Sequence, residues 1–116
     1  RTVEGDLGLR LNAESIIQAV KEALVPGDVR RVLSYPHSMI GSDGIPYDEM
    51  PHPRLWGTFP RVLGHYSRDL GLFPLETAVY KMTGLSAACF GLADRGVVQP
   101  GAAADLVIFD QLELPG

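Results

Sequence analysis

The sequence has little of what marks several large classes of protein. It contains a single cysteine in 116 residues, Cys89, so no disulfide can form within the chain. Ten Lys and Arg stand against 14 Asp and Glu, a net charge of -4, whereas a surface that binds nucleic acid is basic. No apolar run is long enough to span a membrane, and no signal peptide begins the chain. We therefore expect a cytoplasmic protein that binds neither nucleic acid nor membranes.

The composition is that of an ordinary globular protein. Hydrophobic residues make up 46% of the chain, and its length suffices for one domain with a core. The 13 Gly and 9 Pro predict short helices and many loops. Cys89 lies between Ala88 and Phe90, which favours a small buried side chain over a nucleophile. The chain begins with Arg1 and not with Met, and we interpret it as a piece of a longer protein.

Apolar residues at helical spacing predict helices over residues 12–24, 28–33, 56–70, 74–83 and 86–90. Asp28 is the expected cap of the second helix, and Pro60 is expected in the first turn of the third. The short apolar run 38–42 predicts a buried strand. The β-rich tail, residues 96–110, predicts a β-hairpin around a Pro-Gly turn. The expected fold class is α/β with a β-hairpin tail, mainly helical when the chain is seen alone.

A candidate site follows the predicted strand. Asp43 stands at its C-terminal end, and a loop over residues 44–53 with three prolines then leads to His52 and Arg54. Enzymes with an α/β barrel place catalytic residues at the ends of strands and substrate contacts in the following loops. The sequence therefore nominates Asp43 for catalysis, with Arg54 and, more weakly, His52 for binding.

Each of these residues also has an ordinary explanation. Asp-Gly is the usual composition of a turn, an Arg is usually a surface residue, and a lone His is more often structural than a ligand. Ser42 is either a hydrogen-bond partner of Asp43 or an ordinary residue at a strand end. His37 and His65 have no partner at the spacing of metal ligands, so we expect structural roles for both. The aromatic residues are expected in the core, namely Trp56, Phe59 and Tyr66.

Three motifs in this order resemble the C-terminal third of the amidohydrolase superfamily. They are Gly-Ser-Asp-Gly at 41–44, the His-Pro-Arg loop with the following 56–61 segment, and the Arg-Gly…Ala-Asp-Leu-Val tail at 95–107. The tail motif is shared by hydantoinases, dihydroorotases and adenine deaminases. The 43–61 stretch resembles the N-acyl-D-amino-acid deacylases (D-aminoacylases) in particular, including their D-glutamate-specific branch.

The resemblance implies a fold and a reaction. Residues 1–95 would form the end of a (β/α)8 barrel, with 38–42 as its last strand and the helices that follow. Residues 96–116 would form a hairpin that rejoins a small β-sandwich. The missing N-terminal barrel portion would be the partner of this piece. The implied reaction is zinc-dependent hydrolysis of a small-molecule N-acyl-D-amino acid to a carboxylate and a free D-amino acid.

The resemblance also implies roles for single residues. Asp43 would move the proton of the attacking water, and it would bind the metal directly or through that water. Arg54 would hold the α-carboxylate of the substrate through its planar fork of donors. The remaining metal ligands would lie outside this chain, because its histidines do not pair at ligand spacing. We therefore expect no zinc on the isolated piece and no activity from it.

Two other interpretations stay open. One is a different amidohydrolase reaction, of the hydantoinase, dihydroorotase or deaminase type. Arg54 discriminates between this and the deacylase reaction, because a substrate without a free carboxylate would not need it. The other is a stand-alone, non-catalytic domain for folding or interaction. Such a domain would melt cooperatively and stay inactive with zinc, whereas a piece of an enzyme would fold poorly or associate through exposed helix faces.

Overall fold

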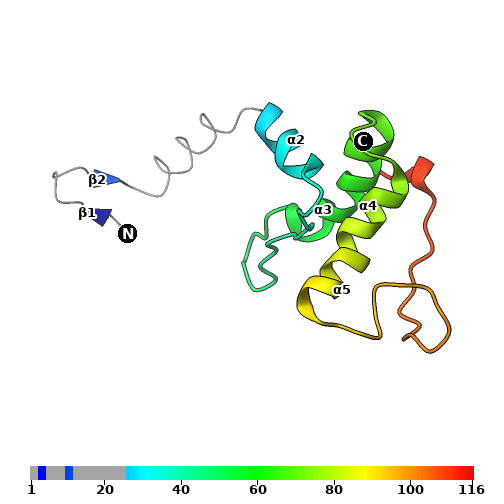
Figure 1. Cartoon of the computed structure of the whole chain (residues 1–116). Coiled ribbons are helices and arrows are strands. Elements are labelled where there is room, and N and C mark those ends of the chain that lie inside the picture. Colours follow the sequence, from blue (N-terminus) through cyan, green and yellow to red (C-terminus); the bar gives the residue numbers. More distant parts are fainter. Residues whose placement is uncertain (1–2, 5–9, 12–25) are drawn as a thin grey trace. The chain divides into compact units, whose positions relative to one another are not determined.

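The computed structural model describes residues 3–4, 10–11 and 26–116 (Figure 1). The chain divides into two units, residues 1–32 and 33–116. In the first unit, β1 (Val3–Glu4) pairs antiparallel with β2 (Arg10–Leu11). The helix predicted over 12–24 lies outside the described residues. In the described part of the chain, no helix is both long and apolar enough to cross a membrane.

The helix predicted over 28–33 is confirmed and begins earlier than expected. It is α2 (Pro26–Ser34), and its first residue is a proline. Proline suits the first position of a helix because its missing N–H would have no partner there. Asp28 therefore lies in the first turn and is not the cap, and it faces Arg31 at 4.0 Å on the same helix. A carboxylate near the N-terminus and a cation near the C-terminus both favour the helix dipole.

Helices are the regular secondary structure of the second unit, which also contains long irregular segments. They are α3 (Arg54–Arg61), the π-helix η1 (Val62–Asp69), α4 (Leu75–Met82), α5 (Gly84–Phe90) and the 3-10 helix η2 (Gln111–Glu113). The predicted helices at 74–83 and 86–90 are thus confirmed. Gly91 ends α5 with a φ of 71°, the left-handed conformation that glycine adopts without strain.

A small core lies between η1 and α4. Val62, Leu63, Phe73 and Ala78 are buried in it. Half-buried apolar residues pack around these four, and they include Leu33, Ile40, Tyr66, Leu72, Leu75, Val79, Met82 and Leu114. The inward positions predicted for the 74–83 helix are therefore confirmed, because the 3.6-residue period places 75, 78, 79 and 82 on one face.

The helix predicted over 56–70 begins at Arg54 and changes its winding at Val62. Pro60 consequently lies inside α3 and not in its first turn. At that position proline cannot donate the backbone hydrogen bond to the preceding turn. The chain then continues as the π-helix η1, and at its end Leu70 N–H bonds to His65 C=O, five residues back, at 2.9 Å.

The strand predicted over 38–42 does not form. Within residues 39–43 the one bond between backbone groups joins Ile40 N–H to Lys81 C=O, at 3.1 Å. A strand needs a neighbouring strand to pair its backbone groups. The two described strands, β1 and β2, pair with each other and not with this segment. The segment therefore runs from α2 toward Asp43 without regular secondary structure.

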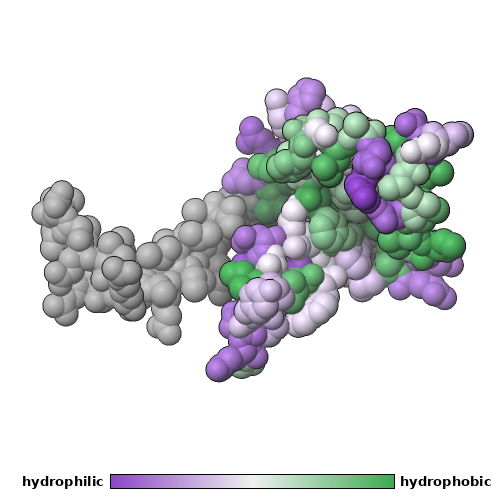
Figure 2. Space-filling model, turned by 90° about the horizontal axis from the view of Figure 1, so that it is seen from below, coloured by the Kyte–Doolittle hydropathy of each residue, from purple (hydrophilic) through white to green (hydrophobic). Residues whose placement is uncertain are grey.

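The tail is likewise without the predicted hairpin, since residues 91–110 contain no strand. Ala103 N–H bonds to Asp94 C=O at 2.8 Å, and Arg95 pairs with Asp105. The β-rich segment stays largely exposed: Val98 is 87%, Val107 84% and Ile108 100% exposed. Figure 2 shows hydrophobic side chains at the surface among polar ones. Residues 96–116 belong to the same unit as the helices.

Three expectations about single side chains were wrong. Cys89 is exposed and not buried, because the last turn of α5, residues 88–90, extends beyond the packed part of the unit. Trp56 is 65% exposed and Phe59 38% exposed, and neither enters the core. Both lie in α3, whereas the buried residues of this segment begin at Val62. Helical spacing predicted one continuous apolar face over residues 56–70, but only the part from Val62 onward packs against the core.

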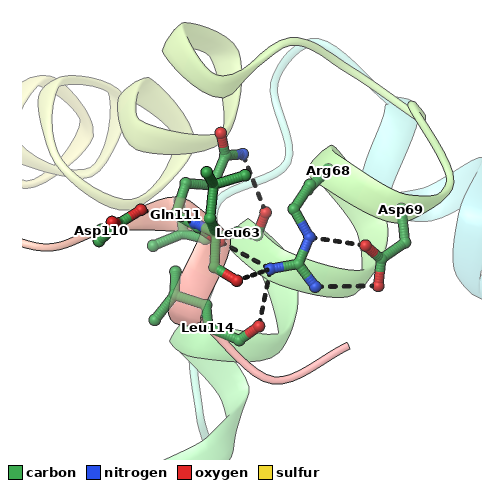
Figure 3. Close-up of polar contacts among 7 residues, drawn as sticks. Leu63, Arg68, Asp69, Asp110, Gln111 and Leu114 are labelled. Carbon is green, nitrogen blue, oxygen red and sulfur yellow. Dashed lines mark hydrogen bonds and ion pairs between the residues drawn. The ribbon is translucent and has the colours of Figure 1, made fainter.

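The C-terminal segment is fastened to η1 through Arg68 (Figure 3). Arg68 Nη1 donates to the carbonyls of Gln111 and Leu114 at 2.7 Å each, while Nε donates to Asp69 Oδ1 at 2.6 Å. Gln111 Nε2 in turn donates to Leu63 C=O at 3.2 Å. The hydrogen bond with Asp69 raises the pKa of Arg68 and lowers the pKa of Asp69. One guanidinium thus joins residues more than 40 positions apart.

Gly96 offers a test of how the tail packs against α5. A Cβ there would lie 2.7 Å from Ala87 Cβ and 2.9 Å from Thr83 O, whereas a Cβ at Gly101 would meet nothing within 4 Å. Both glycines have a positive φ, 82° and 88°, so an alanine is strained by roughly 1–2 kcal/mol at either. We expect Gly96→Ala to cost about 1–3 kcal/mol more, from overpacking. Thermal unfolding of the two variants measures this, and equal midpoints would contradict the packing.

Candidate active site

Asp43 and Arg54 form an ion pair, although eleven residues separate them in the sequence. Arg54 Nη2 lies 3.2 Å from Asp43 Oδ2, and Arg54 Nε donates to the backbone oxygen of Asp43 at 2.7 Å. The Arg54 side chain is 38% exposed and that of Asp43 is 89% exposed. The first residue of α3 thus holds both the backbone and the carboxylate of Asp43.

The backbone at Asp43 has an uncommon conformation. Its φ is 50°, the one positive value among the described residues other than glycine. Aspartate tolerates this region better than most residues, and such outliers concentrate in turns and at functional sites. Ser42 Oγ accepts the N–H of Gly44 at 3.2 Å and so closes the turn around Asp43.

Gly44 lets this turn approach α3 closely. A Cβ at Gly44 would lie 2.9 Å from Leu55 Cα and 2.5 Å from Leu55 Cδ1. Only glycine therefore fits between the turn and the start of the helix. Since Leu55 follows Arg54, this contact brings Asp43 within reach of the guanidinium.

His52 helps to shape the start of α3. Its Nδ1 accepts the N–H of Arg54 at 3.1 Å, and its carbonyl accepts the N–H of Leu55 at 3.0 Å. The first N–H groups of a helix have no partner within the helix, so a nearby acceptor stabilises them. His52 therefore touches the backbone of Arg54, which gives it a positioning role beside the binding role expected from the sequence.

The other histidines lie elsewhere. The His37 ring contacts Tyr35 edge to face with 5.6 Å between ring centroids, and the His65 ring contacts Tyr66 in the same manner at 5.0 Å. Among the described residues, no group of three or more His, Cys, Asp or Glu side chains is placed to hold a metal ion. Of the described residues nominated by the sequence, Ser42, Asp43, His52 and Arg54 thus come together.

This cluster combines a proton acceptor with a donor for anions. The Asp43 carboxylate is open to solvent and can accept a proton from a bound water. A guanidinium carries five N–H donors, and Arg54 directs only part of them at Asp43. Its other donors suit a second carboxylate, because the planar fork matches carboxylate geometry.

One buried residue near this cluster escaped the sequence analysis. Lys81 is 2% exposed, and its Nζ donates to Tyr35 O at 2.5 Å and to Ser38 O and Oγ at 3.2 Å each. Burial lowers the pKa of Lys81 below its ordinary value of 10.5. The signal was a lysine three residues after Ala78, on the inward face of a predicted helix.

Comparison with known proteins shows extensive similarity to one family. The profile of the Amidohydrolase family matches residues 9–114. The D-aminoacylase of Alcaligenes xylosoxydans xylosoxydans is 75% identical over 83 residues, which are 72% of this chain and 17% of that protein. The chain therefore spans about a sixth of the length of this relative.

Solved structures agree with this similarity. A D-aminoacylase studied for its binuclear metal center superposes with a TM-score of 0.74 at 74% identity, over 76% of this chain and 19% of that one. The N-acyl-D-glutamate deacylase of Bordetella bronchiseptica, complexed with zinc and a phosphonate inhibitor, has a TM-score of 0.69 at 55% identity. It covers 71% of this chain and 17% of its own.

Proposed function

This chain belongs to the amidohydrolase family, and from this premise we propose that it is the C-terminal part of a longer zinc-dependent hydrolase. The enzyme cleaves the amide bond of N-acyl-D-amino acids to a carboxylate and a free D-amino acid. One observation carries the proposal: Asp43 and Arg54 lie side by side in a chain that is 75% identical to a D-aminoacylase.

Asp43 acts on the amide bond that is cleaved, and Arg54 binds another part of the substrate. Asp43 accepts a proton from the attacking water and passes it to the leaving nitrogen, as general acid–base catalysis of amide cleavage requires. Arg54 binds the α-carboxylate of the substrate in two parallel hydrogen bonds. Fixing that carboxylate also decides which face of the chiral carbon meets the catalytic groups, and so favours one enantiomer.

The described residues do not by themselves fit a zinc ion. A catalytic zinc takes about three protein ligands. Among the described side chains Asp43 is the one candidate in the cluster, because His52 Nδ1 already accepts the N–H of Arg54 and no group of three ligands occurs. We therefore assign the remaining ligands to the N-terminal barrel portion, the partner of this piece, and expect no zinc on the isolated chain.

The unpaired segments suggest how this piece joins the whole. In the complete enzyme, residues 38–42 would add the last strand of a (β/α)8 barrel, and 1–95 would belong to that barrel. The exposed apolar segment within 96–116 would pair in a small β-sandwich. Both segments have the composition of strands and lack a partner strand among the described residues. Backbone pairing would supply the hydrogen bonds that they do not make here.

Hydrolysis assays on the full-length enzyme test the proposal directly. N-acetyl-D-amino acids and their L enantiomers are offered separately, and we expect turnover of the D series, with bound zinc measured on the same sample. Turnover of cyclic amides or of adenine instead would assign the chain to another amidohydrolase reaction. A non-catalytic domain would be supported if the 116-residue chain melted cooperatively and were monodisperse, and if the enzyme still hydrolysed its substrate after this chain had been removed.

A further inference from the structure

Lys81 ties α4 to the segment that leads to Asp43. Its ammonium bonds to three oxygens of residues 35 and 38, and its backbone carbonyl accepts the N–H of Ile40 at 3.1 Å. Ile40 is three residues before Asp43 and half-buried against the core. The side chain and the backbone carbonyl of Lys81 thus both bond to the segment of residues 35–43, which we call the arm.

The ammonium is held by neutral groups. Within the described residues no carboxylate lies at ion-pair distance from Nζ, and the Phe73 ring faces it with 6.0 Å to the ring centroid. Burying a charge is costly unless its hydrogen bonds are satisfied, and an apolar side chain would fill such a place without that cost. The three bonds of Nζ are therefore what a lysine adds here over a leucine or methionine.

The arm before Asp43 has few other constraints. Ile40 makes the one backbone–backbone bond of residues 39–43, and beyond it the next hold is Arg54, which bonds to the Asp43 carbonyl. The arm is therefore fastened at Lys81 and again at Arg54, with Asp43 at its far end. Without the bonds of Nζ, the position of Asp43 depends on the backbone bond of Ile40, the bond from Arg54 Nε to the Asp43 carbonyl and an exposed ion pair, and such pairs are weak.

We propose that the side chain of Lys81 positions Asp43: through the bonds of Nζ to Tyr35 and Ser38 it fixes the segment that leads to the carboxylate. The inference rests on the proposed function, because it takes Asp43 as the proton acceptor. Lys81 does not touch Arg54, whose place on α3 depends on His52. It reaches Arg54 only through Asp43, so we expect it to act on the chemical step more than on binding of the substrate carboxylate.

Lys81→Met in the full-length enzyme tests the inference, because methionine keeps the length and helix propensity of lysine and removes the donors. We expect kcat to fall about 10- to 100-fold, since a misplacement near 1 Å can cost 10²-fold in rate. KM is expected to stay near that of wild type. Lys81→Arg, which keeps a cation with donors, is expected to recover part of the loss, and Glu76→Gln on the exposed face of α4 is the control.

Hydrogen–deuterium exchange separates positioning from mere stability. With Lys81→Met, the hydrogen-bonded amides of Ser38, Ile40 and Gly44 should exchange faster while those of η1 stay protected. An unchanged kcat per folded molecule, or a rise in KM equal to the fall in kcat, would overturn the inference. If the variant does not fold, Ser38→Ala decides: a smaller kcat loss with unchanged KM supports the inference, and wild-type kinetics refute it. If the wild-type enzyme is inactive on N-acyl-D-amino acids, the proposed function is refuted. Hydrogen–deuterium exchange then still tests whether Lys81 holds the segment before Asp43.

Discussion

Asp43→Asn should lower kcat of the full-length enzyme by about 10²- to 10⁴-fold, the usual contribution of general acid–base catalysis. Asparagine has nearly the shape of aspartate, and its amide oxygen can still accept from Arg54 Nη2, which lies 3.2 Å from the carboxylate. The backbone bond from Arg54 Nε to the Asp43 carbonyl is untouched. The substitution therefore removes the proton acceptor and keeps the geometry, so KM should change little. Steady-state kinetics with an N-acetyl-D-amino acid measure both constants.

The matched control for this prediction is Asp48→Asn. Asp48 lies in the same loop and is exposed, and its Oδ1 accepts only the N–H of Met50, at 3.4 Å, among the described residues. A change there removes the same charge a few residues away, and kcat should stay as in wild type. Near-normal turnover of Asp43→Asn would show that another group takes the proton. Equal losses in both variants would point to the net charge of the loop.

Arg54→Lys should lower kcat/KM for N-acyl-D-amino acids by about 10- to 10²-fold. A charged hydrogen bond contributes about 1.5–3 kcal/mol, and lysine cannot make the two parallel bonds of a guanidinium. The effect should depend on the substrate. Replacing the α-carboxylate with a carboxamide should already slow the wild-type enzyme, and the variant should lose little more with this amide. Comparing acid and amide substrates on both enzymes therefore isolates the bond between Arg54 and the substrate.

Arg54 also holds Asp43, so the same substitution needs a control for position. Equal losses on the acid and the amide would mean that Arg54 serves Asp43 and not the substrate. Arg61→Lys is the matched variant on the same helix, where the guanidinium lies over the Tyr66 ring at 5.6 Å from its centroid. It should leave both substrates unaffected. An enzyme that works equally well without a substrate carboxylate would favour the hydantoinase or deaminase type of reaction.

Local patterns in the sequence predicted the helices of the second unit well. The apolar residues at 75, 78, 79 and 82 recur with the period of a helix, and the structure packs them against the core. The resemblance to the amidohydrolase family, carried by 41–44, the His-Pro-Arg loop and the tail, is confirmed by the comparisons. The catalytic and binding roles of Asp43, Arg54 and His52 stay predictions, although the structure brings these residues together.

The failures have a common cause. Residues 38–42 and the tail around 106–109 have the composition of strands, but strand propensity needs a partner strand before it becomes a ladder. Pro60 was placed in a first turn because proline is frequent there, and Trp56 was placed in the core because it is aromatic. Neither rule says where a helix begins or how much of its apolar face meets a neighbour. Lys81 was not nominated, and its acceptors lie more than 40 residues away in the sequence.

The sequence by itself determined the local conformations and which residues are candidates for the chemistry: short helices between Gly and Pro, a turn at Asp-Gly, one candidate acceptor of protons and one candidate binder of carboxylates. These depend on neighbours within a few residues, which any reader of the chain can see. Only the tertiary structure decided that Arg54 reaches back eleven residues to Asp43, that Gly44 admits this approach, and that Lys81 and Arg68 fasten distant segments. Such contacts are set by how the helices pack, and packing is a property of the whole chain and not of its local patterns.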